Sequence, residues 1–497
     1  MHATMAVHLA QEKDVERLRQ AALLLEAENA RLVRRNVELT RALLTAQGAD
    51  ARHLQLRLAE LERQLDNARA ALFAPSSEKR PAPRPEDMHA PAAVRRGHGP
   101  RVQQPLPLVE VVHVLDEADT QCPSCGGQLA PMTGCFEESE EVDVLERRFV
   151  LKRHRRQKYR CACNACVETA PGPQKLQPQG RYSLDFAVEV AASKYLDHLP
   201  LERQVRAMAR EGLTCDSQTL WDQLSALVRL LLPTYDALWA YQLLRGVLGA
   251  DETRWPLLGS QGQAKWHLWA LASSTAVVYR VAQGRGAQAA RELLKGYCGL
   301  LMTDGYAVYD ALAAASQGRF GVAHCWAHAR RKFLECGAPE ADVALHLIGE
   351  LYRIEREYRT GPPDEARLLA LRQQHSRPLL ERLHAWALAQ TALPESGFGR
   401  ALAYLGKLWP GLTRFVNDAR VPLDNNSTER ALRGPVVGRK NHYGSRSRRG
   451  TQAAALFYSL LESAKLCGLE PKAYLRAAAL AALRGQPPLL PHQMMAH

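Results

Sequence analysis

The sequence LRGVLGADETRW at positions 244–255 opens a series of four short apolar runs that decides the fold class. The other three are KWHLWALAS (265–273), AVVYRVA (276–282) and CGLLMTDGY (298–306). Short apolar runs bounded by turn residues are typical of β-strands. We therefore expect a mixed sheet in which the first run ends at Asp251 and the fourth at Asp304. The two carboxylates should emerge from neighbouring strand ends, where a divalent cation could lie between them.

A third carboxylate follows in PLDNNSTERA (422–431), which predicts the capped start of a helix carrying Glu429. Asp on strand one, Asp on strand four and Glu on a late helix is the order of an RNase H-like fold with a two-metal site. Hard oxygen ligands suit Mg²⁺ or Mn²⁺, which take phosphate oxygens as further ligands. We predict that Asp251, Asp304 and Glu429 bind two such ions per active site and catalyse phosphoryl transfer. Each acid taken alone would be an ordinary surface residue.

The interval between the second Asp and the Glu is too long for one strand and one loop, and residues 343–405 have a helical pattern. We expect a catalytic domain over 243–450 with a helical insertion at about 338–420. The segment 451–497 predicts a closing pair of amphipathic helices whose apolar residues serve core packing.

The motif HCWAHARRKF (324–333) precedes the insertion. His324, Cys325 and His328 have a spacing that suits a metal, but a fourth ligand is missing. A strand end leading into a basic helix explains the motif equally well. In that case the two histidines could instead meet a scissile phosphate.

Two segments are rich in Lys and Arg and contain no acid: RRFVLKRHRRQKYR (147–160), with eight basic residues, and RALRGPVVGRKNHYGSRSRRG (430–450), with seven. Such patches suit phosphate contacts, whereas solvated strand or loop surface is the alternative. Together with the basic part of HCWAHARRKF, they supply the predicted DNA contacts Arg153, Arg155, Arg156, Lys158, Arg330, Arg331, Lys332, Arg430, Arg439, Lys440, Arg446, Arg448 and Arg449.

Residues 176–242 predict a helical region with the outline of a helix-turn-helix. A first helix is expected from Ser183, Gly212 ends a second one, and a third begins after Asp216, a good N-cap residue, and reaches Leu232. Ser217 and Gln218 open this helix and are candidates for DNA contact. Plain packing of a helix pair is an equally good alternative.

Five of the eleven cysteines form two close clusters in a module expected at 108–175. Cys122 and Cys125 are separated by two residues, and so are Cys163 and Cys166. Four thiolates at this spacing suit one structural Zn²⁺, with Cys161 as an alternative ligand. Free thiols in a small β unit are the competing interpretation.

The N-terminal segment 1–73 carries a heptad pattern that predicts a leucine-zipper coiled coil, followed by a Pro-rich linker over 74–107. Asn at a positions favours a register-matched parallel dimer, so we expect a homodimer or higher homo-oligomer. The alternative is an amphipathic helix packed on its own globular core. The predicted seam contains Leu18, Leu25, Asn29, Leu32, Asn36 and Leu39.

The whole-chain composition agrees with a multidomain α+β protein. The chain has 497 residues and a formal net charge of +13, and a basic surplus favours a polyanionic partner such as nucleic acid. It contains no apolar run of ~18 residues and no signal-peptide core, so we expect a cytoplasmic protein without a membrane partner.

Several motifs together resemble the insertion-sequence-66 family of bacterial DDE transposases. They are ADETRW (250–255), TDGY (303–306), DNNSTER (424–430), SSEKR, CPSCGG and HCWAHARRKF. The resemblance implies that Asp251, Asp304 and Glu429 form the catalytic triad, flanked by leucine-zipper, zinc-binding and helix-turn-helix modules. The second cysteine cluster, CACNAC, departs from the simpler pair usual in the family, so the choice between Cys161 and Cys163 stays open.

The same resemblance implies a nucleoid-associated enzyme that binds double-stranded DNA at its element's terminal repeats. It would then catalyse strand cleavage and transfer into target DNA, and accessory proteins from the same element could take part. Two other functions compete with this interpretation. One is a DNA-binding regulator with an inactive RNase H-like domain, and the other is a nuclease of the same fold that cuts without joining.

Overall fold

The computed structural model describes residues 149–160, 167–258 and 265–495, together with Arg31, Arg34, Glu38, Leu61, Val112, Ser124 and Gly126. The predicted zipper seam, the linker and all five candidate zinc-binding cysteines lie outside the described residues. The fold and site below belong to the unit that contains residues 148–497.

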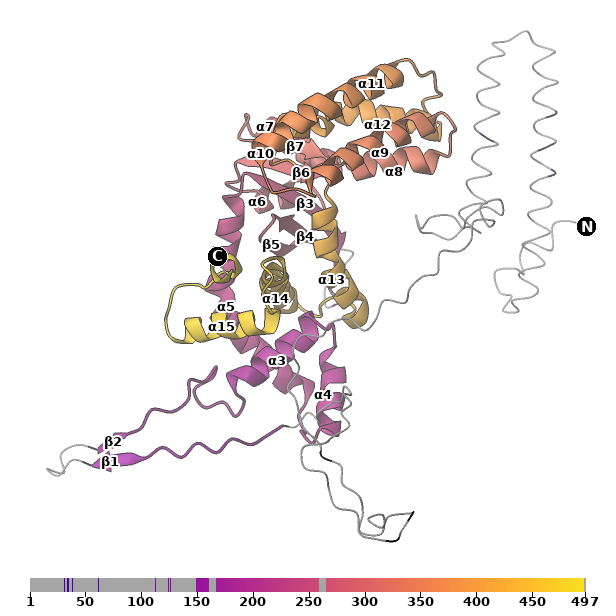
Figure 1. Cartoon of the computed structure of the whole chain (residues 1–497). Helices are drawn as coiled ribbons and strands as arrows, with labels where there is room; N and C mark the ends of the chain where they lie inside the picture. The colour runs from indigo at the N-terminus through magenta and orange to yellow at the C-terminus, as the bar shows by residue number, and fades with distance from the viewer. Residues whose placement is uncertain are drawn as a thin grey trace, which may run out of the picture. The chain divides into compact units, whose positions relative to one another are not determined.

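A five-stranded mixed sheet forms the centre of this unit, in the order β5-β4-β3-β6-β7 (Figure 1). Its first three strands in the chain are antiparallel neighbours, and β6 and β7 then continue the sheet parallel to β3. This arrangement is consistent with an RNase H-like domain, and the four predicted strands are present. The strands are β3 (Val247–Arg254), β4 (Trp266–Ala272), β5 (Val277–Gln283), β6 (Gly299–Thr303) and β7 (Phe320–His324).

One strand end differs from the sequence prediction. β3 does not end at Asp251 but continues to Arg254, because it pairs with β4 as far as Arg254 and His267. On its other side β3 pairs with β6 only over 247–249. Asp251 therefore lies past the end of the parallel pairing while it is still held in the antiparallel ladder.

Three helices precede the sheet: α3 (Leu184–Tyr195), α4 (Leu201–Arg210) and α5 (Ser217–Leu243). The expected cap is present, since the Asp216 carboxylate accepts a hydrogen bond from the Thr219 N–H at 2.6 Å. α5 does not end at Leu232 as its pattern suggested. It runs through Pro233, because buried Leu231, Tyr235 and Leu238 pack it on the core on both sides of the proline.

The helices before and after the sheet share one hydrophobic core with it. Val188 of α3, Leu227 of α5 and Leu268 of β4 belong to the same buried cluster as Phe457 of α14 and Leu475 of α15. The boundary expected near 242 therefore does not separate two cores. The C-terminal helices are α14 (Arg448–Leu466) and α15 (Pro471–Leu483).

α14 also covers the edge strand β5 (Figure 1). The hydroxyl of Ser463 accepts a hydrogen bond from the Val277 N–H at 2.9 Å, and that of Ser459 accepts one from the Tyr279 N–H at 2.8 Å. These hydroxyls satisfy backbone donors that an edge strand would otherwise expose, which protects the sheet from pairing with another chain.

A second buried cluster lies among the helices that follow β7. Within it, Arg372 is 1 % exposed and donates two hydrogen bonds to Glu355, at 2.7 and 2.9 Å. None of the helices in the described part of the chain is both long and apolar enough to cross a membrane. The helices of this region are α8 (Trp326–Cys336), α9 (Ala341–Tyr358), α10 (Glu365–Leu371), α11 (Arg377–Leu388) and α12 (Gly397–Leu412).

Three further helices complete the surroundings of the sheet. α6 (Ala287–Leu293) contacts β5, α7 (Ala307–Ala315) contacts β7, and α13 (Asn426–His442) contacts β3 and β4. Figure 1 shows α13 extending from the region of β3 and β4 toward α3, with which it is also in contact. A short hairpin, β1 (Lys158–Arg160) with β2 (Val167–Thr169), precedes α3.

Candidate active site

The sheet register brings Asp251 and Asp304 together on one face. Gly249 of β3 pairs with Met302 of parallel β6, so continuing this register by two residues sets Asp304 beside Asp251. Burial raises the pKa of Asp251 to about 7, and the nearby negative charges of Glu252, Asp304 and Glu429 add to this effect. The three predicted acids thus act on one another electrostatically.

Glu429 reaches this face because α13 begins directly against β3. A Cβ atom on Gly249 would lie 2.0 Å from Thr428 Oγ1 and 2.6 Å from Asn425 Oδ1. The Asn425 side chain donates a hydrogen bond to the Ala250 carbonyl at 2.9 Å. Glycine at 249 is therefore required for the close approach that delivers Glu429, in the first turn of α13, to the carboxylates.

The HCWAHARRKF motif forms the end of β7 and the start of α8. Thr303 pairs with His324, so alternation of side chains places His324 on the face opposite to Asp304, where its Nε2 lies 3.3 Å from Asp310 Oδ1. Cys325 and His328 lie instead with Glu429, their ligand atoms all within 4.8 Å of one another. The structure thus separates His324 from the other two residues of the predicted metal group, and Glu429 of α13 takes its place beside Cys325 and His328.

Glu252, which the sequence interpretation did not single out, lies on the opposite face of β3. Its carboxylate accepts hydrogen bonds from Arg285 Nε at 2.5 Å and from the Tyr309 hydroxyl at 2.8 Å. Arg285 also approaches Asp304, with 4.0 Å between its Nη2 and Asp304 Oδ2, and its guanidinium lies over the Tyr306 ring. The acidic pattern in ADET is the only signal in the sequence that pointed to Glu252.

The helices after β7 contact the end of β6 at Asp304 through α12. The Tyr404 hydroxyl donates a hydrogen bond to the Asp304 carbonyl at 2.6 Å. Gly305 has φ +90°, and a Cβ there would lie 2.5 Å from Leu408 Cδ1 and 3.0 Å from the Tyr404 hydroxyl. The glycine of TDGY is therefore needed both for its backbone conformation and for this packing.

The residues present fit a divalent metal centre. Asp251, Asp304 and Glu429 bring three carboxyl groups close enough for their charges to raise the pKa of Asp251, and the guanidinium of Arg285 lies 4.0 Å from Asp304. Glu429 Oε1 is buried and has no hydrogen-bond partner. Mg²⁺ and Mn²⁺ bind oxygen ligands. Either ion would neutralise the negative charge of these carboxylates and give the buried Glu429 oxygen a partner.

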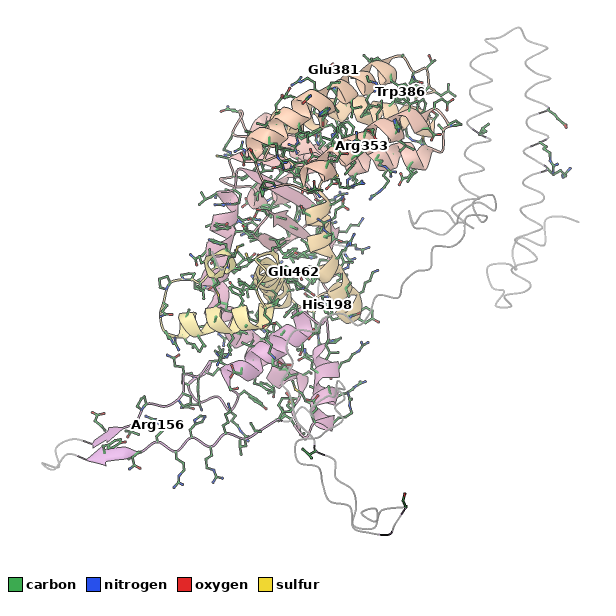
Figure 2. All side chains as sticks on the ribbon, viewed as in Figure 1. Arg156, His198, Arg353, Glu381, Trp386 and Glu462 are labelled. Carbon is green, nitrogen blue, oxygen red and sulfur yellow. The ribbon has the colours of Figure 1, made fainter. Side chains whose placement is uncertain are left out.

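Most of the predicted DNA contacts are on the surface. Arg156, labelled in Figure 2, precedes β1 and donates to the Ala170 carbonyl at 2.6 Å across the hairpin. Arg439 differs, because its guanidinium donates to Thr253 Oγ1 at 2.9 Å and to the Arg254 carbonyl, and so supports the end of β3. Ser217 and Arg330 are half-buried. The exposed candidates are Arg153, Arg155, Arg156, Lys158, Gln218, Arg331, Lys332, Arg430, Lys440, Arg446, Arg448 and Arg449.

Comparison with known proteins places this site in a family. The family described as "Transposase IS66 family" matches residues 179–453, which include all three predicted catalytic acids. The family described as "zinc-finger binding domain of transposase IS66" matches residues 119–164, a range that contains Cys122, Cys125, Cys161 and Cys163 and ends before Cys166.

Similar proteins occur in Sinorhizobium fredii. The protein named "Uncharacterized protein y4jD" is 33 % identical over 392 residues, covering 74 % of this chain and 76 % of the relative. The protein y4hP is 29 % identical over 404 residues, with 75 % and 73 % coverage. From the two matched domains and the likeness to these relatives, the chain belongs to the IS66 family of DDE transposases, which implies a role in DNA transposition.

Proposed function

We propose that the protein binds the ends of its insertion sequence and catalyses metal-dependent cleavage and joining of DNA strands at Asp251, Asp304 and Glu429. The observation that carries this proposal is the gathering of these acids from β3, β6 and α13, with burial and neighbouring charge raising the pKa of Asp251 to about 7. Such repulsion among carboxylates is relieved when cations bind between them.

Two divalent ions held by these acids would supply activation of a water or 3′-hydroxyl and stabilisation of the leaving oxygen. The protein's own part is to fix the three carboxylates before substrate arrives. The antiparallel ladder holds Asp251, the Tyr404 hydrogen bond holds the main chain at Asp304, and the Gly249 contact seats the helix that bears Glu429. A preorganised arrangement of this kind lowers the barrier because little needs to move during reaction.

The exposed side of α13 is the surface that we propose for the DNA backbone beside the site. Arg430, Arg433 and Lys440 are exposed at helical spacing, and Glu429 is the single acid in this helix. The helix begins at the carboxylates, so this basic stripe leads directly away from them. Positive charge there would offset phosphate repulsion by the catalytic acids.

The remaining modules complete the proposal. A zinc-binding module at 108–175 would use Cys122 and Cys125 with two of the three thiols in CACNAC, and a zipper over 1–73 would join protomers so that two element ends meet before strand transfer. Helices at 176–242 would add DNA contacts through Ser217 and Gln218. Accessory proteins of the same element would act with this assembly at the nucleoid.

The test is cleavage of a labelled duplex carrying the element's terminal repeats by full-length protein, with Mg²⁺ or Mn²⁺. Wild type should give metal-dependent products, whereas Asp251→Asn and Glu429→Gln should bind the duplex without cleaving it. Asp342→Asn is the matched control, since this exposed acid lies in the first turn of α9. Binding without cleavage by wild type would support a regulator instead, and equal products from all variants would exclude these acids from catalysis.

A further inference from the structure

His328 and Glu429 form a half-buried pair that the proposed roles of the three acids do not explain. His328 Nδ1 lies 3.6 Å from Glu429 Oε1, and each atom is buried without a hydrogen-bond partner. Among the described residues, Cys325, His328 and Glu429 are the one group of metal-ligand side chains whose atoms lie within 4.8 Å of one another. A buried donor and acceptor this close, yet not bonded to each other, indicate a missing shared partner.

The two elements that carry this pair are fixed to each other. The Trp326 N–H, at the start of α8, donates to the Leu423 carbonyl at 3.1 Å, and the Asn425 N–H donates to Cys325 Sγ at 3.3 Å. The Trp326 indole donates to the Leu412 carbonyl at 2.8 Å. The first turns of α8 and α13 are therefore held together, so the separation of imidazole and carboxylate is set by the fold.

The geometry suits a cation better than a direct hydrogen bond. Nitrogen and oxygen ligands with bonds of ~2.1 Å span 3.6 Å at an angle of about 120°, which is close to the range of common metal geometries. A direct N–H···O bond would require an approach to about 3.2 Å or less. Cys325 already accepts the Asn425 N–H, so its sulfur forms the wall of the site.

We propose that His328 is a nitrogen ligand, with Glu429, to one of the two catalytic cations, while Asp251 and Asp304 offer oxygen alone to the other. The site is then asymmetric. A nitrogen ligand disfavours Mg²⁺, which is held by oxygen ligands, so this position prefers Mn²⁺ to Mg²⁺. The inference rests on the proposed function because it takes Glu429 as a metal ligand, but it is tested by binding and spectroscopy without DNA.

The experiment measures Mn²⁺ bound to full-length, chelator-treated protein by pulsed electron paramagnetic resonance, which detects coupling to a ligating ¹⁴N. Wild type should show coupling to an imidazole nitrogen. His328→Gln should lose this coupling, and its affinity for Mn²⁺ should be about tenfold lower. Mg²⁺ affinity should change much less. His324→Gln is the matched control and should keep the coupling, because its ring lies on the other face of the sheet.

A second variant separates loss of the ligand from loss of the fold. His328→Asp supplies oxygen in place of nitrogen, so it should restore cation binding without ¹⁴N coupling and without the preference for Mn²⁺. The proposal would be overturned if the coupling persisted in His328→Gln, or if wild type bound Mn²⁺ without any nitrogen coupling. Either result would leave the proposed role of the three acids unaffected. Absence of any Mn²⁺ binding that depends on Asp251 and Asp304 would instead overturn the proposed function.

Discussion

The phenolic oxygen of Tyr404 lies 2.6 Å from the main-chain oxygen of Asp304, although 100 positions separate the two residues. This bond joins helix α12 to the loop that carries Asp304, one of the three proposed catalytic acids. Leu408 of the same helix contacts Gly305. The helices between β7 and α13 are therefore part of the support of the active site, and their effect on catalysis can be measured with small substitutions.

Tyr404→Phe should lower the rate of strand cleavage about fivefold while the protein remains folded. The lost hydrogen bond is worth about 1 kcal/mol, which corresponds to that factor if it is fully expressed in the transition state. The rate of strand cleavage is measured in a single turnover with saturating protein. Tyr358→Phe removes a hydroxyl bonded to the Asp364 carbonyl in the same helical region and should leave the rate unchanged. Equal effects of the two variants would argue against a role for Tyr404 in positioning Asp304.

Gly249→Ala should reduce cleavage by about 100-fold, because the new Cβ displaces the start of α13 and moves Glu429 by a fraction of an ångström to an ångström. Adding Thr428→Ala removes the nearest clashing oxygen, so the double variant should recover part of the activity. Gly406→Ala in α12 meets nothing within 4 Å and should be neutral or slightly stabilising. Full activity in Gly249→Ala would show that the close approach of α13 and β3 is not needed.

The affinity for Mn²⁺ should fall as the pH drops below about 7, because burial and the neighbouring carboxylates raise the pKa of Asp251 to about that value. One competing proton lowers the apparent affinity about tenfold per pH unit. The raised pKa also affects stability without metal, because the folded protein then holds the Asp251 proton more tightly than the unfolded chain does. This contribution to stability is fully present below the pKa of the unfolded chain and is lost as the pH rises toward 7. Added Mn²⁺ should therefore raise the melting temperature more at pH 8 than at pH 6, and Asp251→Asn should reduce this difference.

Removing charge from the basic stripe of α13 should weaken DNA binding in a salt-dependent way. In Arg430→Gln/Arg433→Gln, the slope of log affinity against log salt should decrease in magnitude by about 2, as expected for two lost phosphate contacts. The control is Arg353→Gln in α9, labelled in Figure 2, whose guanidinium is paired with Glu350 and Glu357. An unchanged slope in the double variant would place the DNA on another surface.

Local patterns predicted four of the five strands of the sheet, because short apolar runs bounded by turn residues are properties of neighbouring positions. The Asp216 cap was predictable for the same reason. The sequence pattern predicted the wrong end for α5, because tertiary packing decides where this helix ends. Buried residues on both sides of Pro233 keep the chain helical through the proline. The pattern failed again at Asp251, since the length of β3 depends on how far β4 continues to pair with it.

The relations among distant segments could not be predicted from one sequence. The separation of His324 from Cys325 follows from side-chain alternation only once the register of β6 and β7 is known. Likewise, nothing near Tyr404, Arg285 or Gly249 indicates that these residues contact the acids. Their roles arise from contacts between segments far apart in the chain, and those contacts depend on the whole fold.

The most direct test of the central claim is a strand-transfer assay with purified full-length protein, a labelled duplex ending in the element's terminal repeat, a target plasmid and Mg²⁺ or Mn²⁺. Wild type and Asp342→Asn should both yield joined products, whereas Asp304→Ala should bind the duplex and yield neither cleaved nor joined DNA. Joined products from Asp304→Ala at the wild-type level would contradict the assignment of the active site. Cleavage by wild type that is never followed by joining would contradict the assignment as a transposase and favour a nuclease.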